Sequence, residues 1–333
     1  MTIFTEKFLS TKNSKIAEEI RIKGFFKCEN ALTPEFLSNI EKDVKSSGLS
    51  LNNNYVSGVY FTHGNQFFLT HMLAASKSFY NYCTNSKVIA FCKEYFGSEF
   101  SLKALRYYEN FGNQNMMWHT DNRSYEKLKQ KETHTTDLGI IFLAYISDVA
   151  DGEFQYVKGS QIWSGENTHH DFTTDYIEKN YADDIVGFKG KKGNIIIYNS
   201  WGVHRAKPST NKDFIRKTLF FQVEKKTKFR EPILLNSEFI SDVSEDLKMY
   251  LGFGKKATNK VYPRTDIYTM PLNKKVSLIV YKWILSRMLL SLPGFIRKRV
   301  RNYYNIPTNK NYWFGMLRFK LNPYIFKFFK KII

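Results

Sequence analysis

Cysteine is scarce in this chain of 333 residues, which has only Cys28, Cys83 and Cys92 and no CxxC pair. An odd number of cysteines without paired spacing supports neither a disulfide framework nor a thiolate zinc site, and it favours a reducing compartment. The N-terminus lacks a basic region followed by an apolar run, so we expect no secretory signal. With 43% hydrophobic and 24% charged residues, the composition excludes wholesale disorder. We therefore expect a folded cytoplasmic protein.

Acidic residues are absent from the last fifth of the chain. Asp266 is the last of them, and residues 267–333 contain 14 Lys and Arg and 14 aromatic residues. This segment, which we call the basic tail, carries +14 of the formal net charge of +19 and leaves +5 for the rest. Because the surplus of positive charge is confined to this segment, it favours an anionic partner that binds there over nucleic acid that contacts the whole protein surface.

The basic tail combines apolar and cationic stretches. An apolar run over residues 276–292 contains Lys282 and Arg287, each of which would cost about 2.5–3.5 kcal/mol inside a bilayer, so a full membrane span is not expected. An amphipathic helix followed by a basic cluster suits an anionic membrane surface, which would place the protein at the inner membrane face. The alternative is a helical extension that packs on the main domain. Nucleic acid ranks lower, because the many Leu, Ile and Phe residues favour hydrocarbon or a core.

The rest of the chain divides by pattern into a leader or short helix over residues 1–22, a main domain over 23–230 and a linker over 231–266. Helices are expected after Thr33-Pro34, over residues 86–96 with Gly97 as the terminator, and around 242–251. Short apolar or alternating runs indicate strands, and they cover residues 101–110, 137–149, 152–160, 193–200 and 214–226. Strands that follow a helical N-terminal part predict a jelly roll buttressed by helices.

A candidate metal site begins at Trp118-His119-Thr120-Asp121. His119 and Asp121 are two residues apart, so on an extended chain both side chains reach the same ion. His204 directly follows the apolar run GNIIIYNS and is the best candidate for a third ligand. Two imidazoles and one carboxylate form the facial triad of non-haem Fe(II) oxygenases. An HxD pattern alone also arises by chance, so the assignment needs a second signal.

Arg216 supplies that second signal, twelve residues after His204. If the two residues lie on neighbouring antiparallel strands, the guanidinium returns towards the metal. Arginine binds a carboxylate through two parallel hydrogen bonds. A dicarboxylate that chelates iron at one end would therefore find a partner for its other end.

These stretches together resemble the phytanoyl-CoA dioxygenase (PhyH) family of Fe(II)/2-oxoglutarate oxygenases. The resemblance rests on WHTD, GEFQYVKGSQ and GNIIIYNSWGVHRAKPSTNKDFIRK, with GFFKCENALTPEFL as the opening strand and helix. It implies a double-stranded β-helix, iron held by His119, Asp121 and His204, and a salt bridge from Arg216 to the distal carboxylate of 2-oxoglutarate. The chain departs from the family pattern in three ways: the hairpin VKGSQ lacks the usual proline, Gln161 stands in place of its terminal histidine, and Asn194 stands in place of an acidic residue.

The family resemblance also narrows the reaction. Halogenating relatives lack the carboxylate ligand, so the presence of Asp121 favours hydroxylation. Arg106 and Tyr108 share a face of their strand and are candidate contacts for 2-oxoglutarate, although sheet packing explains the tyrosine equally well. Trp118 and Trp201 flank the ligands and are candidate walls of the substrate cavity. The adjacent His169 and His170 are expected on a solvated surface rather than at a metal.

The sequence thus predicts an Fe(II)/2-oxoglutarate-dependent dioxygenase that uses O₂ to hydroxylate a C–H bond and releases succinate and CO₂. A small molecule or a lipid- or glycan-linked compound is the expected substrate class. The alternative is a catalytically inactive barrel-fold binding or scaffold protein that its basic tail recruits to an anionic membrane. Neither the individual substrate nor the oligomeric state follows from the residues.

Overall fold

The computed structural model describes most of the main domain and little of the C-terminal part. The described residues are 2–46, 59–62, 66–69, 72–97, 99–111, 116–121, 139–163, 173–209, 211, 213–225, 234–236, 239, 243–253 and 270–272.

The chain forms two compact units that share some of their elements. The first unit contains residues 1–38, 81–103 and 109–227, and the second contains residues 39–80, 104–108 and 228–333. The site residues His119, Asp121, His204 and Arg216 all belong to the first unit.

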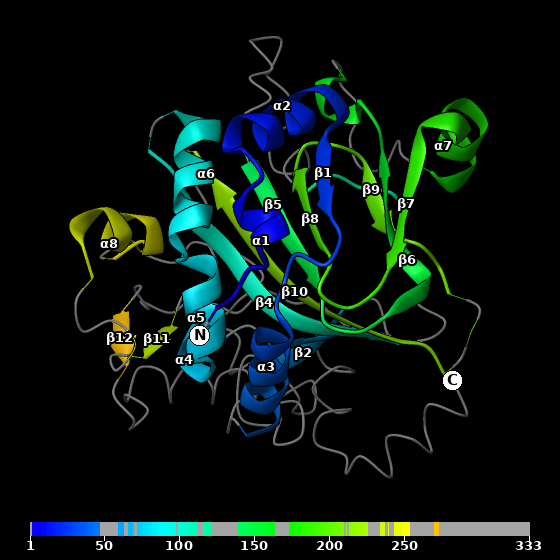
Figure 1. Cartoon of the computed structure of the whole chain (residues 1–333). Coiled ribbons are helices and arrows are strands. Elements are labelled where there is room, and N and C mark those ends of the chain that lie inside the picture. The colour runs from blue at the N-terminus through cyan, green and yellow to red at the C-terminus, as the bar shows by residue number, and fades with distance from the viewer. Residues whose placement is uncertain are drawn as a thin grey trace, which may run out of the picture. The chain divides into compact units, whose positions relative to one another are not determined.

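The larger sheet of the first unit has the order β1-β8-β5-β10-β4 (Figure 1). The β1–β8, β8–β5 and β5–β10 pairs are antiparallel. Every residue of β5 and β8 is buried, as expected for strands covered on both faces. These uninterrupted apolar runs are what the sequence pattern detected. The strands are β1 (Phe25–Cys28), β4 (Ser101–Phe111), β5 (Gly139–Tyr145), β8 (Ile195–Asn199) and β10 (Ile215–Glu224).

A smaller sheet in the order β7-β6-β9 forms the second layer, with β7 at Ile185–Gly190, β6 at Val149–Val157 and β9 at His204–Ala206. Both pairings are antiparallel. The layers meet where the Phe154 ring lies 4.5 Å from that of Tyr198, and where the Tyr145 hydroxyl donates to the Phe188 carbonyl at 2.8 Å. Two antiparallel sheets packed in this way confirm the double-stranded β-helix.

Helices cover the other face of the larger sheet (Figure 1). Phe91 of α6 packs edge-on against Phe142 of β5 at 5.9 Å between ring centroids, and Tyr82 of α5 packs against Phe221 of β10 at 5.2 Å. Aromatic pairs at these separations add to the free energy gained by burial. The helices with residues in this unit are α1 (Glu6–Leu9), α2 (Asn13–Lys23), α3 (Pro34–Ser46), α5 (Lys77–Cys83), α6 (Ser86–Phe96) and α7 (Thr174–Asn180).

The expected helix ends of α3 and α6 are confirmed. The Thr33 hydroxyl accepts a hydrogen bond from the Phe36 amide at 3.2 Å, and α3 begins at Pro34. α6 ends at Gly97, whose left-handed backbone closes the last turn. The segment 1–22, interpreted as a leader or short helix, contains α1 and most of α2, which bury Phe8, Ile16 and Ile20.

The second unit contains the β2–β3 hairpin, with β3 next to β4, and a separate parallel pair of β11 and β12. α8 falls where a helix around residues 242–251 was expected. Its elements are β2 (Val59–Thr62), β3 (Gln66–Leu69), α4 (Met72–Ala75), β11 (Leu234–Asn236), α8 (Glu245–Leu251) and β12 (Met270–Leu272).

The basic tail lies outside the described residues apart from β12, so its expected helices are neither seen nor contradicted. Within the part of the chain that is described, no helix combines the length and the apolar character needed to cross a membrane.

Candidate metal centre

The two candidate histidine ligands lie opposite each other on neighbouring strand segments. The His119 amide donates to the His204 carbonyl at 3.0 Å, and the His204 amide donates to the His119 carbonyl at 2.9 Å. The Asp121 amide donates to the Ser200 carbonyl at 3.1 Å, which fixes the segment two residues further on. Because i and i+2 share a face of an extended segment, this register brings all three side chains together.

The ligand atoms of His119, Asp121 and His204 all lie within 4.8 Å of one another. Nε2 of His204 is 3.3 Å from Oδ2 of Asp121, and Nε2 of His119 is 4.0 Å from Oδ1 of the same carboxylate. An ion between them, at the usual 2.0–2.2 Å from imidazole nitrogen and carboxylate oxygen, would require only small side-chain adjustments. The structure therefore brings together the set that the sequence predicted.

Backbone carbonyls fix the tautomer of both histidines. Nδ1 of His119 lies 2.9 Å from the Met117 carbonyl, and Nδ1 of His204 lies 2.9 Å from the Gly202 carbonyl. A carbonyl only accepts, so each Nδ1 carries the proton and each Nε2 is free to bind a metal. Such an outer hydrogen bond is the usual device that orients a metal-binding imidazole.

The Asp121 carboxylate has a buried oxygen that fits a cation. Among the described residues no group makes a hydrogen bond of good geometry to Oδ2 of Asp121. Burial raises the pKa of Asp121, but the charges of His204, His119 and Lys103 outweigh burial and hold that pKa below its usual range. Asp121 is therefore ionised at neutral pH, and its negative charge suits a bound cation.

Aromatic rings enclose His204, whose side chain is only 4% exposed. The ring centroids of Tyr198 and Phe154 lie 5.0 Å and 5.6 Å from that of the imidazole. The Tyr156 ring is parallel to the imidazole, with 6.3 Å between their centroids. This wall lies inside the double-stranded β-helix, between the two sheets. It keeps one side of the candidate metal position dry and apolar.

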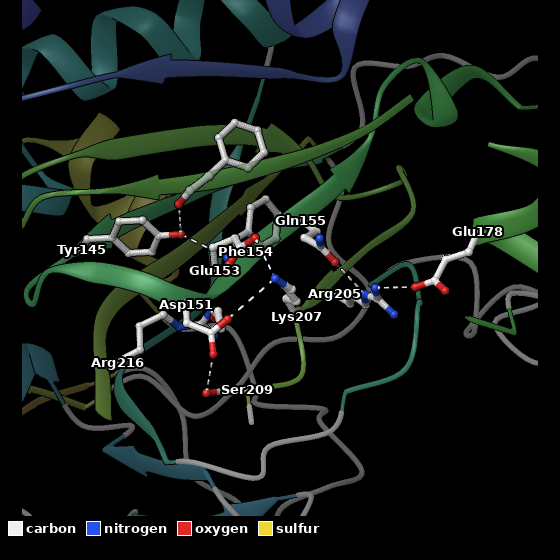
Figure 2. A network of polar contacts seen from close by, with 12 residues as sticks. Tyr145, Asp151, Glu153, Phe154, Gln155, Glu178, Arg205, Lys207, Ser209 and Arg216 are labelled. Atoms are coloured by element: carbon white, nitrogen blue, oxygen red, sulfur yellow. Dashed lines mark hydrogen bonds and ion pairs between the residues drawn. The ribbon is translucent and has the colours of Figure 1, made fainter. Parts of the chain in front are cut away.

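Arg216 is a buried cation that has no acidic partner among the described residues. It lies on β10, is 2% exposed, and donates to the Gly152 carbonyl and, at 3.0 Å, to Oδ1 of Asn110. No carboxylate of the described residues pairs with it, and its Nε has no hydrogen-bond partner there. Figure 2 shows Arg216 beside the irregular part of β6 that contains Asp151. A buried cation is costly without a counter-ion, so this arrangement fits an anionic ligand.

Two more buried polar groups near Arg216 have no partner among the described residues. They are Nδ2 of Asn110 and Oγ1 of Thr218. Thr218 is two residues from Arg216 on β10, so the two side chains share a face. The sequence analysis did not find this pair, although the spacing of Arg216 and Thr218 was a usable signal. Asn110 gave no such signal.

Two of the departures from the family pattern have structural roles. The Gln161 side chain is buried and donates to the Arg21 carbonyl at 2.9 Å, which ties the short 3-10 helix after β6 (Ser160–Ile162) to α2. Oδ1 of Asn194 accepts a hydrogen bond from the Asn30 amide at 2.9 Å. Both substitutions stabilise connections in the fold and leave the three candidate ligands in place.

The structure also describes the other candidate residues of the site. Trp118 has no exposed surface and packs in a core cluster with Val157, Ile177 and Val203. Trp201 is buried and precedes β9. Arg106 and Tyr108 belong to the part of β4 assigned to the second unit. Their contacts with substrate or 2-oxoglutarate stay predictions. The other five histidines, His169 and His170 among them, lie outside the described residues.

Comparison with known proteins agrees with the resemblance. Residues 67–218 match the family described as phytanoyl-CoA dioxygenase (PhyH). This stretch contains all three candidate ligands and Arg216, and the family resemblance is thereby confirmed. No curated protein matches the chain.

Solved structures share the fold at low sequence identity. HygX from Streptomyces hygroscopicus, with nickel and 2-oxoglutarate bound, is 15% identical with a TM-score of 0.53, over 72% of this chain and 94% of that one. The epimerase SnoN from nogalamycin biosynthesis, in complex with Fe³⁺, alpha ketoglutarate and nogalamycin RO, is 14% identical with a TM-score of 0.52, over 78% and 95%. The alpha ketoglutarate dependent carbocyclase SnoK is 11% identical with a TM-score of 0.52, over 72% and 93%.

Proposed function

We propose, for a chain whose residues 67–218 form a PhyH-family domain, that the protein is an Fe(II)/2-oxoglutarate-dependent oxygenase. His119, Asp121 and His204 would hold the iron, and Arg216 would bind the distal carboxylate of 2-oxoglutarate. The observation that carries this proposal is the pairing of two incomplete sites in one domain. One is a cation site with three converging ligand atoms, and the other is the buried cation of Arg216, beside which the described part of the chain places no acid.

The donor set suits iron better than the metals of structural sites. Two imidazoles and one carboxylate leave coordination positions open, as an oxygenase needs. The three cysteines are buried, and burial raises the pKa of Cys83 and Cys92, so these thiols do not compete as ligands. An inactive scaffold would have no need for a buried Arg216 that pairs with no carboxylate of the described residues. We therefore favour the enzyme over that alternative.

Bound together, iron, 2-oxoglutarate and O₂ supply oxidative decarboxylation of the co-substrate, with oxidation of a substrate C–H bond. The residues of this chain position these groups. Arg216, held by Asn110 and the Gly152 carbonyl, would fix the far end of the co-substrate so that its 2-oxo acid end faces the metal. Tyr198, Phe154 and Tyr156 exclude water beside His204.

Hydroxylation is the outcome we propose, because the complete triad includes Asp121. Two of the structural neighbours are an epimerase and a carbocyclase, so the same fold supports other outcomes in those proteins. HygX has been solved with hygromycin B bound, at a TM-score of 0.51 and 14% identity. The substrate class that we propose is a small molecule or a lipid- or glycan-type compound.

Anaerobic titration with Fe(II) and 2-oxoglutarate tests the proposed class. We expect a charge-transfer absorption band that saturates at one equivalent of iron, because the three candidate ligands form one site and would leave coordination positions open for the chelating co-substrate. On exposure to air, slow uncoupled turnover is expected to release succinate. A chain that gives neither the band nor succinate would contradict the proposal.

For the basic tail we propose binding to an anionic membrane surface on the cytoplasmic side. Its 14 cations and lack of acidic residues support this, since each Lys or Arg near such a surface contributes about 1 kcal/mol. We expect the full chain to co-sediment with vesicles that contain phosphatidylserine and to be released by high salt. Replacement of Arg297, Lys298, Arg299 and Arg301 by Gln removes about 4 kcal/mol by the same arithmetic and should weaken binding about 700-fold.

The membrane test needs a matched control and a neutral surface. Four Lys→Gln changes on the described unit, at Lys7, Lys93, Lys189 and Lys192, alter net charge equally but leave the basic tail intact. Two results would refute an electrostatic role for the tail. One is an equal loss of binding to the anionic vesicles in both variants, and the other is undiminished binding of the full chain to vesicles of neutral lipid.

A further inference from the structure

The strand segments that carry the two histidines have a second face, turned away from the candidate metal. Because His119 and His204 are directly opposed, the next opposed pair in the antiparallel register is Trp118 and Arg205. Side chains alternate along a strand, so this pair lies behind the ligand pair. On the other side of β9, Arg205 is registered with Gln155 of β6, just as His204 is with Tyr156. A row of Trp118, Arg205 and Gln155 thus backs the row that contains the ligands.

Arg205 contacts both other residues of this row and a glutamate of α7. Its guanidinium carbon lies 4.2 Å from the centroid of the Trp118 ring. Its Nε donates to Oε1 of Gln155 at 2.8 Å, and one terminal nitrogen donates to Oε1 of Glu178 on α7 at 2.9 Å (Figure 2). The side chain is 6% exposed. A planar guanidinium can stack on a ring and form these bonds in its own plane at once, which a lysine cannot.

The link between Trp118 and Arg205 matters because few backbone hydrogen bonds hold the ligand strands together. The bridge between His119 and His204 is an isolated pair rather than part of a named strand ladder, and β9 has only three residues. Side-chain contacts across such a short ladder therefore carry much of its rigidity. A cation over the face of a buried tryptophan is one of the stronger contacts of this kind.

We propose that Arg205 is a positioning residue of the metal centre. It clamps the two ligand-bearing segments from behind and so sets the separation of Nε2 of His119 from Nε2 of His204. Trp118 is its partner in this role, which explains why a tryptophan directly before the ligand is fully buried in a core cluster. The inference rests on the proposed metal site and adds residues that touch neither metal nor substrate.

Calorimetric titration of the metal-free full chain with Co(II) alone tests the clamp, with the visible absorption of the complex as a report on ligand geometry. Residues outside the ligand set typically change metal affinity 10–100-fold when replaced, and we expect Arg205→Leu to weaken Co(II) binding within that range and to shift the absorption bands. Arg205→Lys keeps the charge but cannot stack and bond in one plane, so it should give an intermediate affinity. Lys207→Leu is the matched control.

Lys207 suits that purpose because it directly follows β9, two residues beyond Arg205. It pairs with Asp151 and Glu153, each at 3.7 Å, rather than with Trp118. We expect its replacement to change Co(II) affinity less than twofold. Equal losses for Arg205→Leu and Lys207→Leu would overturn the clamp and indicate a general effect of charge on this strand.

Two further variants separate positioning from simple stabilisation. Glu178→Gln weakens only the bond from Arg205 to α7 and is expected to leave Co(II) affinity within about threefold of wild type. Trp118→Leu should weaken binding as Arg205→Leu does, and the double variant should be no weaker than the worse single variant, because the pair acts as a unit. Additive losses, or an unchanged absorption spectrum in Arg205→Leu, would refute the proposal. If the wild type binds no Co(II), the proposed metal site itself is wrong.

Discussion

His204→Ala is expected to abolish 2-oxoglutarate-dependent succinate formation and to weaken Fe(II) binding by more than about 100-fold, beyond the range seen for outer hydrogen-bond partners. The imidazole of His204 is the most buried of the three candidate ligands, so no water can replace it at low cost. Its removal leaves His119 and Asp121 as two ligands on one short segment. Anaerobic Fe(II) titration with an absorption readout, followed by a succinate assay, measures both effects.

The His204 variant needs a control for folding and one for imidazole count. Three aromatic rings surround His204, so thermal unfolding of the metal-free protein should first show that the variant folds. His170→Ala removes one imidazole from a position that we do not assign to the metal, and it should bind Fe(II) like the wild type. Full turnover in folded His204→Ala would refute the ligand assignment.

The sequence predicted the parts of the site that depend on short-range geometry. His119 and Asp121 share a face because they are two residues apart, and the apolar runs of β5 and β8 are buried throughout. The ends of α3 and α6 followed from Thr33 and Gly97, whose capping roles are local. Each of these inferences needs only the residues within one element.

What the sequence could not give was the pairing between distant segments. The bridge between His119 and His204 joins residues far apart in the chain, and β9 is too short for any periodicity. β7 was missed because its exposed and half-buried positions include two glycines. Trp118 was considered as a cavity wall because it precedes a ligand, yet alternation alone places it on the opposite face from His119. That same register is what reveals its contact with Arg205.

Arg216→Leu is expected to weaken 2-oxoglutarate binding about 10–150-fold, the equivalent of one hydrogen-bonded charge pair of 1.5–3 kcal/mol. Fe(II) binding should stay within about twofold, because Arg216 is not a candidate ligand. Arg216→Lys should fall between, since an ammonium keeps the charge but cannot form two parallel bonds to a carboxylate. Titration of the Fe(II)-loaded protein with 2-oxoglutarate measures the dissociation constant directly.

Lys217→Met is the matched control for Arg216, because it removes a cation from the next position of β10, on the opposite face. It should bind 2-oxoglutarate like the wild type. A second readout does not need turnover. Excess 2-oxoglutarate should raise the unfolding temperature of the Fe(II)-loaded wild type and of Lys217→Met, and it should raise the unfolding temperature of Arg216→Leu much less. Wild-type affinity in Arg216→Leu would assign the co-substrate carboxylate to another cation and leave the buried, unpaired guanidinium of Arg216 to serve a different anion.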